Sequence, residues 1–292
     1  MNPLHAACYA DQAIWCRAPV VENVAIAEST YRVRIPCPEL AKRIVPGQFV
    51  MVRLAERSDP LLARPFALYD TYYDSGESAG IDVVYLVKGR FTSALSRCGA
   101  GTEVEIWGPL GNGFSTRPVE HLIMVAGGIG QTPFLALGAE FLGRKQFGAP
   151  GRERSSARRV TLCYGARRSS MLAGLDDFRN QGIDLRIATD DGSAGHHGFV
   201  TDLLNELIRG ETLLDEARIA CCGPEPMMAA VARIANEAGI ACELSLETPM
   251  ACGIGVCFTC VARVRTDHAE GWDYKRTCVE GPVFDATQVL LE

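Results

Sequence analysis

The segment HLIMVAGGIGQTPFLALGAEFL (residues 121–142) decides the fold of this chain. An unbroken apolar run leads through a glycine-rich turn into apolar residues at helical spacing. This order is typical of a parallel sheet that is covered by helices on both faces. The alternation continues in RVTLCYGAR (159–167), DLRIATDDGS (184–193) and ARIACCGPEPMMAAVARIANEAG (217–239). We therefore expect an α/β domain with a parallel sheet over residues 118–242.

The chain before this domain, residues 18–117, has the pattern of a β-barrel. Short stretches of alternating polar and apolar residues recur there, separated by Pro and Gly. They are VENVAIAE (21–28), TYRVRIP (30–36), QFVMVRL (48–54), IDVVYLVKG (81–89) and GTEVEIWG (101–108). Several short strands at nearly even spacing favour a small Greek-key barrel. The whole chain is thus predicted to be an α+β multidomain protein.

Residues 243–292 form a third region, which is rich in cysteine. Cys252, Cys257 and Cys260 have the spacing C-x4-C-x2-C, and Cys278 follows after 17 residues. Structural zinc usually binds to two C-x2-C pairs or to Cys and His pairs, whereas this region has one such pair and no nearby His at ligand spacing. The plant-type [2Fe–2S] pattern has this spacing with a distant fourth Cys. We expect a [2Fe–2S] module, with structural zinc or reduced core cysteines as the alternatives.

Composition and charge exclude several classes of protein. The net charge of −6 gives no electrostatic basis for binding nucleic acid. The N-terminus lacks a charged segment followed by an apolar core, and no apolar run approaches the ~20 residues that span a bilayer. We therefore expect a cytoplasmic protein with no membrane partner. The dispersed cysteines are expected to be small apolar residues of the core: Cys8, Cys16, Cys37, Cys98, Cys163 and Cys242.

Two turns of the α/β domain are expected to bind NAD. Each follows an apolar strand, and in a parallel sheet both emerge at the carboxyl edge, where ligands bind. The first opens a helix, whose positive end and close backbone approach favour a pyrophosphate. Its motif is G-x-G-x-x-P rather than G-x-G-x-x-G, so a plain tight turn is the alternative. The predicted residues are Gly127, Gly128, Gly130 and Thr132 in the first turn and Cys222, Gly223 and Pro224 in the second.

A flavin is expected between the dinucleotide and the cluster. NADH gives up two electrons together as hydride, whereas an iron–sulfur cluster carries one electron at a time, so a flavin is the expected converter. The barrel offers RPFALY (64–69), in which Arg64 supplies a cation for a phosphate and the other residues supply apolar surface for the ring system. Taken alone, this stretch also fits an ordinary strand.

A set of motifs along the chain resembles, in order, those of a known family. They are PGQFVMV (46–52), RPFALY (64–69), GPLGNGF (108–114), GGIGQTP (127–133), ATDDGSAGHHGFVTD (188–202), CGPEPMM (222–228), MACGIGVCFTC (250–260) and CVEGPVFDA (278–286). Together they resemble the electron-transfer subunit of the two-subunit, NAD-linked dihydroorotate dehydrogenase, within the ferredoxin–NADP reductase superfamily. The resemblance covers the chain from about residue 20 to the end, and the cysteine module is its most specific part.

The resemblance implies that two barrel segments bind FAD. In the first, Ala67 stands where the family commonly has Ser. The second has the form YR-x-x-G-x-G-T, and here Leu86 replaces the basic residue and Phe91 replaces the second Gly, with Lys88 or Arg90 as compensating cations. The implied FAD residues are Arg64, Pro65, Phe66, Ala67, Val84, Tyr85, Leu86, Phe91 and Thr92. The resemblance likewise implies that the cluster ligands are Cys252, Cys257, Cys260 and Cys278.

The function that the resemblance implies is electron transfer from NADH to FAD, then to the [2Fe–2S] cluster, and on to FMN in a separate catalytic subunit. That subunit oxidises dihydroorotate to orotate in pyrimidine biosynthesis, with net flow toward NAD, in a heterotetramer of two plus two. One alternative is an FAD/[2Fe–2S] subunit of an NAD(P)H-dependent ferredoxin or sulfide-type reductase complex. A second is a non-enzymatic scaffold with a zinc module. Asp190-Asp191 favours NADH, whereas Arg167-Arg168 would suit NADPH.

Overall fold

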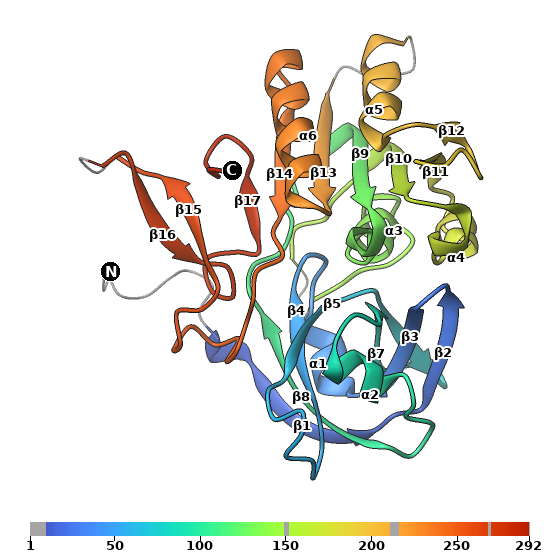
Figure 1. Ribbon diagram of the computed structural model, residues 1–292, viewed down its shortest axis with the longest axis vertical. Coiled ribbons are helices and arrows are strands. Elements are labelled where there is room, and N and C mark those ends of the chain that lie inside the picture. The colour runs from blue at the N-terminus through green and yellow to red at the C-terminus, as the bar shows by residue number, and fades with distance from the viewer. Residues whose placement is uncertain (1–9, 149–151, 211–215, 268–269, 292) are drawn as a thin grey trace.

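Two antiparallel sheets of four strands each build the N-terminal barrel (Figure 1). The computed structural model describes residues 10–148, 152–210, 216–267 and 270–291, so Cys8 lies outside the described residues. One sheet has the order β1 (Ile14–Pro19), β8 (Glu103–Leu110), β4 (Phe49–Leu54) and β5 (Arg64–Ala67). The other has the order β2 (Glu22–Ala27), β3 (Thr30–Pro36), β7 (Glu77–Leu86) and β6 (Asp70–Asp74). The short elements η1 (Ala10–Gln12), α1 (Pro38–Arg43) and α2 (Arg90–Leu95) complete this domain.

Alternation along these strands fills the barrel. Val33 and Ile35 of β3 and Val50 and Val52 of β4 are all buried in one cluster, because residues two apart on a strand face the same side. The expectation that the dispersed cysteines are small apolar residues of the core is confirmed for Cys37, Cys98, Cys163 and Cys242, which are buried, and Cys16 packs against the barrel core. The Sγ atoms of Cys16 and Cys37 lie 2.8 Å apart, since the fold brings β1 beside the residue that precedes α1.

Within the described part of the chain, the α/β domain is built on a sheet of seven strands. Their order is β12 (His196–His197), β11 (Asp184–Thr189), β10 (Ala157–Ala166), β9 (Val119–Gly127), β13 (Ala217–Cys222), β14 (Ala241–Ser245) and β17 (Val283–Asp285). All neighbours pair in parallel except β14 and β17, which are antiparallel. The sheet therefore contains β14, which crosses the expected boundary at 242/243, and β17 from the cysteine-rich region.

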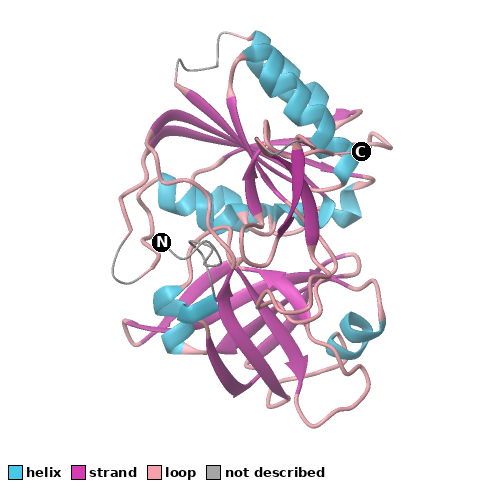
Figure 2. Ribbon diagram, turned by 90° about the vertical axis from the view of Figure 1, so that its left-hand side faces the viewer, coloured by secondary structure: helices cyan, strands magenta, loops and turns pink. Residues whose placement is uncertain are grey.

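Helices cover both faces of this sheet, and one layer lies between the sheet and the barrel (Figure 2). Leu122 and Met124 of β9 pack with α3 (Phe134–Phe141) and α4 (Leu175–Asn180). Ile123 and Val125, on the opposite face, pack with α5 (Val200–Arg209) and α6 (Glu225–Ala238). Every residue of β9 from 121 to 126 is buried, as expected for a central strand with two covered faces. The short helices η2 (Gly128–Gln131) and η3 (Ser169–Met171) follow β9 and β10.

The C-terminal region adds a two-stranded hairpin, β15 (Val261–Arg265) and β16 (Trp272–Arg276), beside the sheet (Figure 1). The prediction of a β-barrel domain followed by an α/β domain and a C-terminal cysteine region is confirmed. Among the described residues, no helix is long and apolar enough to cross a membrane.

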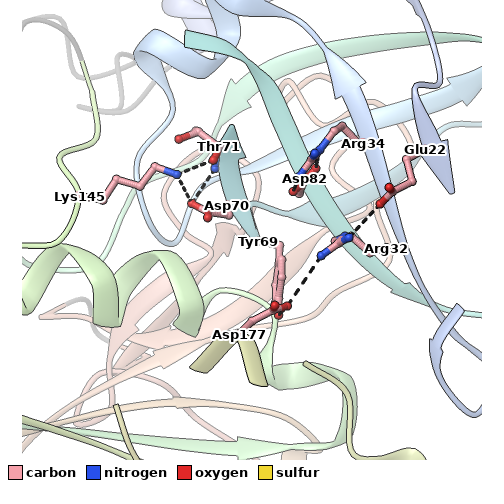
Figure 3. A network of polar contacts seen from close by, with 9 residues as sticks. All are labelled: Glu22, Arg32, Arg34, Tyr69, Asp70, Thr71, Asp82, Lys145 and Asp177. Carbon is pink, nitrogen blue, oxygen red and sulfur yellow. Dashed lines mark hydrogen bonds and ion pairs between the residues drawn. The ribbon is translucent and has the colours of Figure 1, made fainter. Parts of the chain in front are cut away.

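Polar contacts join the barrel to the α/β domain (Figure 3). The Lys145 ammonium, which follows α3, donates to Asp70 Oδ1 at 2.6 Å and to the carbonyl of Thr71. On α4, Asp177 accepts from the Tyr69 hydroxyl at 2.7 Å and lies 4.0 Å from the Arg32 guanidinium. These contacts fix how the two domains sit against each other.

We expect Lys145→Met to destabilise the protein by about 2 kcal/mol, because it leaves Asp70 without its cation at a largely desolvated site. Burial raises the pKa of Asp70, and the Lys145 ammonium opposes that shift. The urea-unfolding midpoint, followed by tryptophan fluorescence, measures the change. Lys42→Met is the control, because the exposed pair of Lys42 with Glu39 contributes little. Equal midpoints for the two variants would contradict this account of the interface.

Candidate functional site

A cavity of about 860 Å³ lies between the barrel and the α/β domain. Its volume is within the range of ligand-binding pockets. From the barrel it is lined by every residue predicted to bind FAD: Arg64, Pro65, Phe66, Ala67, Val84, Tyr85, Leu86, Phe91 and Thr92. The two barrel segments that the resemblance pointed to are therefore brought together at one surface.

The pairing of β5 with β4 places the first segment. Ala67 lies opposite Phe49 and Arg64 lies opposite Val52, so the strand runs along the cavity wall. The Arg64 guanidinium donates to the carbonyls of Leu62 and Ala63 at 3.1 and 3.0 Å. These bonds hold its charge at the cavity, where an anionic group can reach it.

The second segment supplies an aromatic wall. The ring of Phe66 lies 5.8 Å from that of Tyr85 and 6.0 Å from that of Phe91. Burial raises the pKa of Tyr85, whose hydroxyl donates to Asn23 Oδ1 at 3.0 Å, so this side chain is neutral. The Thr92 hydroxyl accepts from the backbone amides of Lys88 and Gly89 at 3.0 and 3.1 Å, which shapes the loop before α2.

Cationic side chains of the cavity wall compensate for the positions at which this chain departs from the family motif. Lys88 and Arg90 both line the cavity, next to Leu86, which stands where a basic residue was expected. An apolar wall with several cations suits a ligand that has a flat ring system and phosphates, and the cavity therefore fits FAD.

The carboxyl ends of β9 and β13 meet in close backbone contact. A Cβ added to Gly130 would lie 2.2 Å from the Cys222 carbonyl oxygen, and one added to Gly223 would lie 2.9 Å from the Gly127 nitrogen. Such spacing excludes any side chain at these positions. The predicted NAD residues that line the cavity are Gly130, Thr132 and Cys222. The others, Gly127, Gly128, Gly223 and Pro224, belong to the same two turns but are not part of the cavity lining.

The segment after β14 is a part of the site that the sequence reasoning missed. Together with Ser245, the last residue of β14, it lines the cavity with Leu246, Glu247, Thr248, Pro249, Met250 and Ala251. Because β14 is parallel to β13, this segment leaves the same carboxyl edge as the two turns. The apolar run IACELSL (240–246) is a signal that could have extended the sheet this far.

The segment continues directly into the cysteine loop. Gly253 and Gly255 have φ values of +73° and +82°, which favour glycine. A Cβ on Gly253 would lie 2.5 Å from Met51 Cγ, so the loop rests on β4 of the barrel. The Trp107 indole also donates to the Cys252 carbonyl at 3.2 Å. The loop is therefore attached to the barrel beside the cavity, which Thr259 also lines.

The cysteines of this loop lie as two pairs. The Sγ atoms of Cys260 and Cys278 lie 3.1 Å apart, and Cys257 lies beside Cys252 with its Sγ 3.1 Å from the Thr259 hydroxyl. The Thr259 hydrogen bond lowers the pKa of Cys257 to about 6, and the contact with Cys278 lowers the pKa of Cys260 to about 6. A lowered pKa favours the thiolate, which is the form that binds metal, at Cys257 and Cys260, whereas the contact with Cys260 raises the pKa of Cys278.

Among the described residues, no three His, Cys, Asp or Glu side chains converge as a ready metal cage. The fit to an iron–sulfur cluster rests instead on the donor set. Sulfur donors in two pairs suit two irons with two thiolates each, whereas a single structural zinc needs four converging donors. The residues present therefore fit a [2Fe–2S] cluster.

Comparisons with known families assign the three regions. Residues 17–114 match the oxidoreductase FAD-binding domain, and residues 124–233 match the oxidoreductase NAD-binding domain. Residues 247–290 match the iron–sulfur cluster binding domain of dihydroorotate dehydrogenase B. The chain is 34% identical, over 94% of its length and 98% of the relative's, to the dihydroorotate dehydrogenase B (NAD(+)) electron transfer subunit of Caldanaerobacter subterraneus subsp. tengcongensis.

This chain belongs to the dihydroorotate dehydrogenase B electron transfer subunit family. The family member from Desulforamulus reducens is also 34% identical, over 94% of this chain and 98% of that one. The prediction of FAD-, NAD- and iron–sulfur-binding domains is thereby confirmed.

One solved structure extends the likeness beyond this family. A chain of the NADH-dependent reduced ferredoxin-NADP oxidoreductase, described in work on flavin-based electron bifurcation, superposes with a TM-score of 0.76 at 28% identity. The match covers 94% of this chain and 90% of that one. The fold of this chain is thus shared with a protein that is named for a different reaction.

Proposed function

We propose that this chain is the electron-transfer subunit of an NAD-linked dihydroorotate dehydrogenase. It passes electrons between NAD(H), FAD and a [2Fe–2S] cluster and serves a separate FMN-containing catalytic subunit. The observation that carries the proposal is the shared cavity, which the FAD segments, the glycine turn of β9 and the segment leading into the cysteine loop all line. The FAD segments and the glycine turn therefore share one site, and Ala251 and Thr259 of that site are next to Cys252 and Cys260 in the chain.

Each group of residues has a distinct task in this proposal. When bound, FAD supplies the conversion between hydride and single electrons. Arg64 and Lys88 hold its phosphates, and the Phe66 and Tyr85 rings pack against its apolar surface. The turn at Gly130 admits the pyrophosphate of NAD(H) to the carboxyl edge of the sheet. Cys252, Cys257, Cys260 and Cys278 hold the two irons.

The partner and the assembly are also part of the proposal. The name of these relatives identifies them as subunits, which supports a catalytic partner that oxidises dihydroorotate in pyrimidine biosynthesis. We propose a heterotetramer of two plus two, located in the cytoplasm. This chain then needs no orotate site of its own.

A second candidate differs in the electron acceptor. The likeness to the NADH-dependent reduced ferredoxin-NADP oxidoreductase favours an FAD/[2Fe–2S] subunit that serves a ferredoxin-type reductase complex. The internal path of electrons is the same in both candidates, and the partner distinguishes them.

Co-expression with the dihydroorotate dehydrogenase catalytic subunit of the same organism tests the partner. We expect the two chains to co-purify through a tag on this chain and to catalyse dihydroorotate-dependent reduction of NAD. A flavin and iron–sulfur protein that purifies alone and ignores that subunit would overturn the proposed partner and favour the second candidate.

We expect Arg64→Ala to weaken FAD binding by about 10-fold, because a charge-assisted hydrogen bond to a phosphate is lost. The ratio of FAD to protein after gel filtration, read from the visible spectrum, measures the effect. Arg57→Ala is the matched control, since Arg57 is an exposed barrel arginine outside the cavity lining. Unchanged FAD content in Arg64→Ala would contradict the assigned role.

A further inference from the structure

The position of the cavity indicates where each half of a bound dinucleotide lies. The cavity extends from the turn of β9 toward β13 and β14, where Cys222 and Ser245 line it. The nicotinamide must reach this cavity to meet the flavin. The adenosine half must then extend the other way from the pyrophosphate, over the carboxyl ends of β10 and β11.

The loops at those two ends are joined to each other. The Ser169 amide, after β10, donates to Ser193 Oγ at 2.7 Å, and the Ser193 amide donates to Asp191 Oδ1 at 2.9 Å. The Asp191 amide in turn donates to the carbonyl of Arg167 at 3.2 Å. One surface therefore carries both Arg167-Arg168, which would suit NADPH, and Asp190-Asp191, which favours NADH. The sequence alone did not decide between these two preferences.

A residue of the barrel forms an ion pair with Arg168, the second of these arginines. Glu28, at the turn between β2 and β3, accepts from Arg168 Nε at 3.1 Å and from Arg168 Nη2 through its other oxygen. Ser170 Oγ donates to Glu28 Oε2 at 2.5 Å, and the Glu28 amide donates to the Ser170 carbonyl at 2.8 Å. Both side-chain oxygens and the backbone amide of Glu28 are thus hydrogen-bonded to the loop after β10.

The charges at this surface disfavour a 2′-phosphate. Arg168 is the kind of residue that accommodates the 2′-phosphate of NADPH, but a bidentate carboxylate already satisfies its guanidinium. The hydrogen bond from Arg168 lowers the pKa of Glu28, so the carboxylate is ionised at neutral pH. Asp191 lies near enough to Arg168 to interact with its charge. Carboxylates suit the ribose hydroxyl of NADH and repel a phosphate.

We propose that Glu28 is a specificity-determining residue through which the barrel favours NADH over NADPH. Its ion pair with Arg168 keeps this guanidinium from binding the 2′-phosphate of NADPH. Glu28 is a positioning residue, since it acts through the guanidinium rather than by touching the reacting atoms. The inference rests on the proposed function, in which NAD(H) exchanges hydride with the flavin at this site.

The test compares NADH and NADPH as reductants of the purified FAD-loaded chain with ferricyanide as acceptor. In Glu28→Ala we expect the kcat/KM for NADPH to rise by about 10-fold, because one charge-assisted hydrogen bond to phosphate becomes available. The gain should appear as a lower KM with kcat unchanged, and it should shrink at high salt, where exposed charges are screened. The kcat/KM for NADH should stay near that of the parent protein.

Two further variants distinguish a change in the preference between NADH and NADPH from a loosened contact between the two domains. Glu28→Ala combined with Arg168→Ala should lose the gain, because the cation that receives the phosphate is absent. Ser170→Ala removes a partner of Glu28 but leaves the ion pair, and its preference should match that of the parent protein. Glu28→Gln is the milder substitute if Glu28→Ala loses FAD.

Three results overturn the inference: no gain for NADPH in Glu28→Ala and Glu28→Gln, a gain that persists without Arg168, or a parent protein that already prefers NADPH. A parent protein whose flavin neither dinucleotide reduces would instead contradict the proposed function.

Discussion

Replacement of Cys257 by Ser is expected to abolish electron transfer beyond the flavin while NADH still reduces the flavin. Serine lacks the soft sulfur donor that iron–sulfur clusters require, so the cluster loses one of its ligands. Cys257 is the best of the four positions for this test because its side chain is exposed, whereas Cys260 and Cys278 are buried. Its loss therefore removes a donor without opening a cavity in the core.

The measurements are iron and acid-labile sulfide per chain, the FAD content, and NADH oxidation with two acceptors. Reduction of ferricyanide measures electron transfer as far as the flavin, and reduction of the catalytic subunit measures electron transfer along the whole path. We expect partner-linked activity to fall by at least about 100-fold and ferricyanide reduction to persist, since losing even an outer-shell partner of a metal ligand costs up to this much. Cys16→Ser, in the barrel, is the matched control. Retained transfer to the partner would show that Cys257 is not a ligand.

Replacement of Gly130 by Ala is expected to slow reduction of the flavin by NADH by about 100-fold. The added Cβ would lie 2.2 Å from the oxygen and 2.5 Å from the carbon of the Cys222 carbonyl. Both are backbone atoms, so the turns after β9 and β13 must move apart. A displacement of this size at a positioning site costs about 100-fold in rate.

Stopped-flow reduction of the flavin by NADH gives the rate, and the visible spectrum gives the FAD content, which should not change. Gly128→Ala is the control in the same turn. A Cβ there meets nothing within 4 Å, and the cost is limited to the φ of +54°, which side chains adopt rarely. We therefore expect a much smaller loss than in Gly130→Ala. Equal losses in the two variants would contradict the close-contact explanation.

The sequence predicted those features of the site that depend on local pattern. Short stretches of sequence are enough to recognise the apolar strand that ends at Gly127 and the turn after it. The same holds for the spacing of Cys252, Cys257 and Cys260. The barrel strands were predicted from their alternation, although β1 begins at Ile14, before the expected start of the domain at 18.

Features that depend on contacts distant in sequence were not predicted. β17 joins the sheet antiparallel to β14, a pairing that no local pattern encodes. Cys16 approaches Cys37 because two barrel elements meet. Glu28 reaches Arg168 across 140 positions of sequence, a contact that no local pattern encodes. The segment after β14 was assigned to the cysteine region, which hid its place at the carboxyl edge of the sheet.

An anaerobic titration of the purified chain alone with NADH, followed by visible absorbance and electron paramagnetic resonance, tests the central claim most directly. The account predicts bleaching of the flavin together with the appearance of the signal of a reduced [2Fe–2S] cluster. The contrary result is a chain with full FAD, iron and sulfide in which NADH bleaches the flavin and the cluster stays oxidised. That result would show that the shared cavity does not connect the flavin to the cysteine loop.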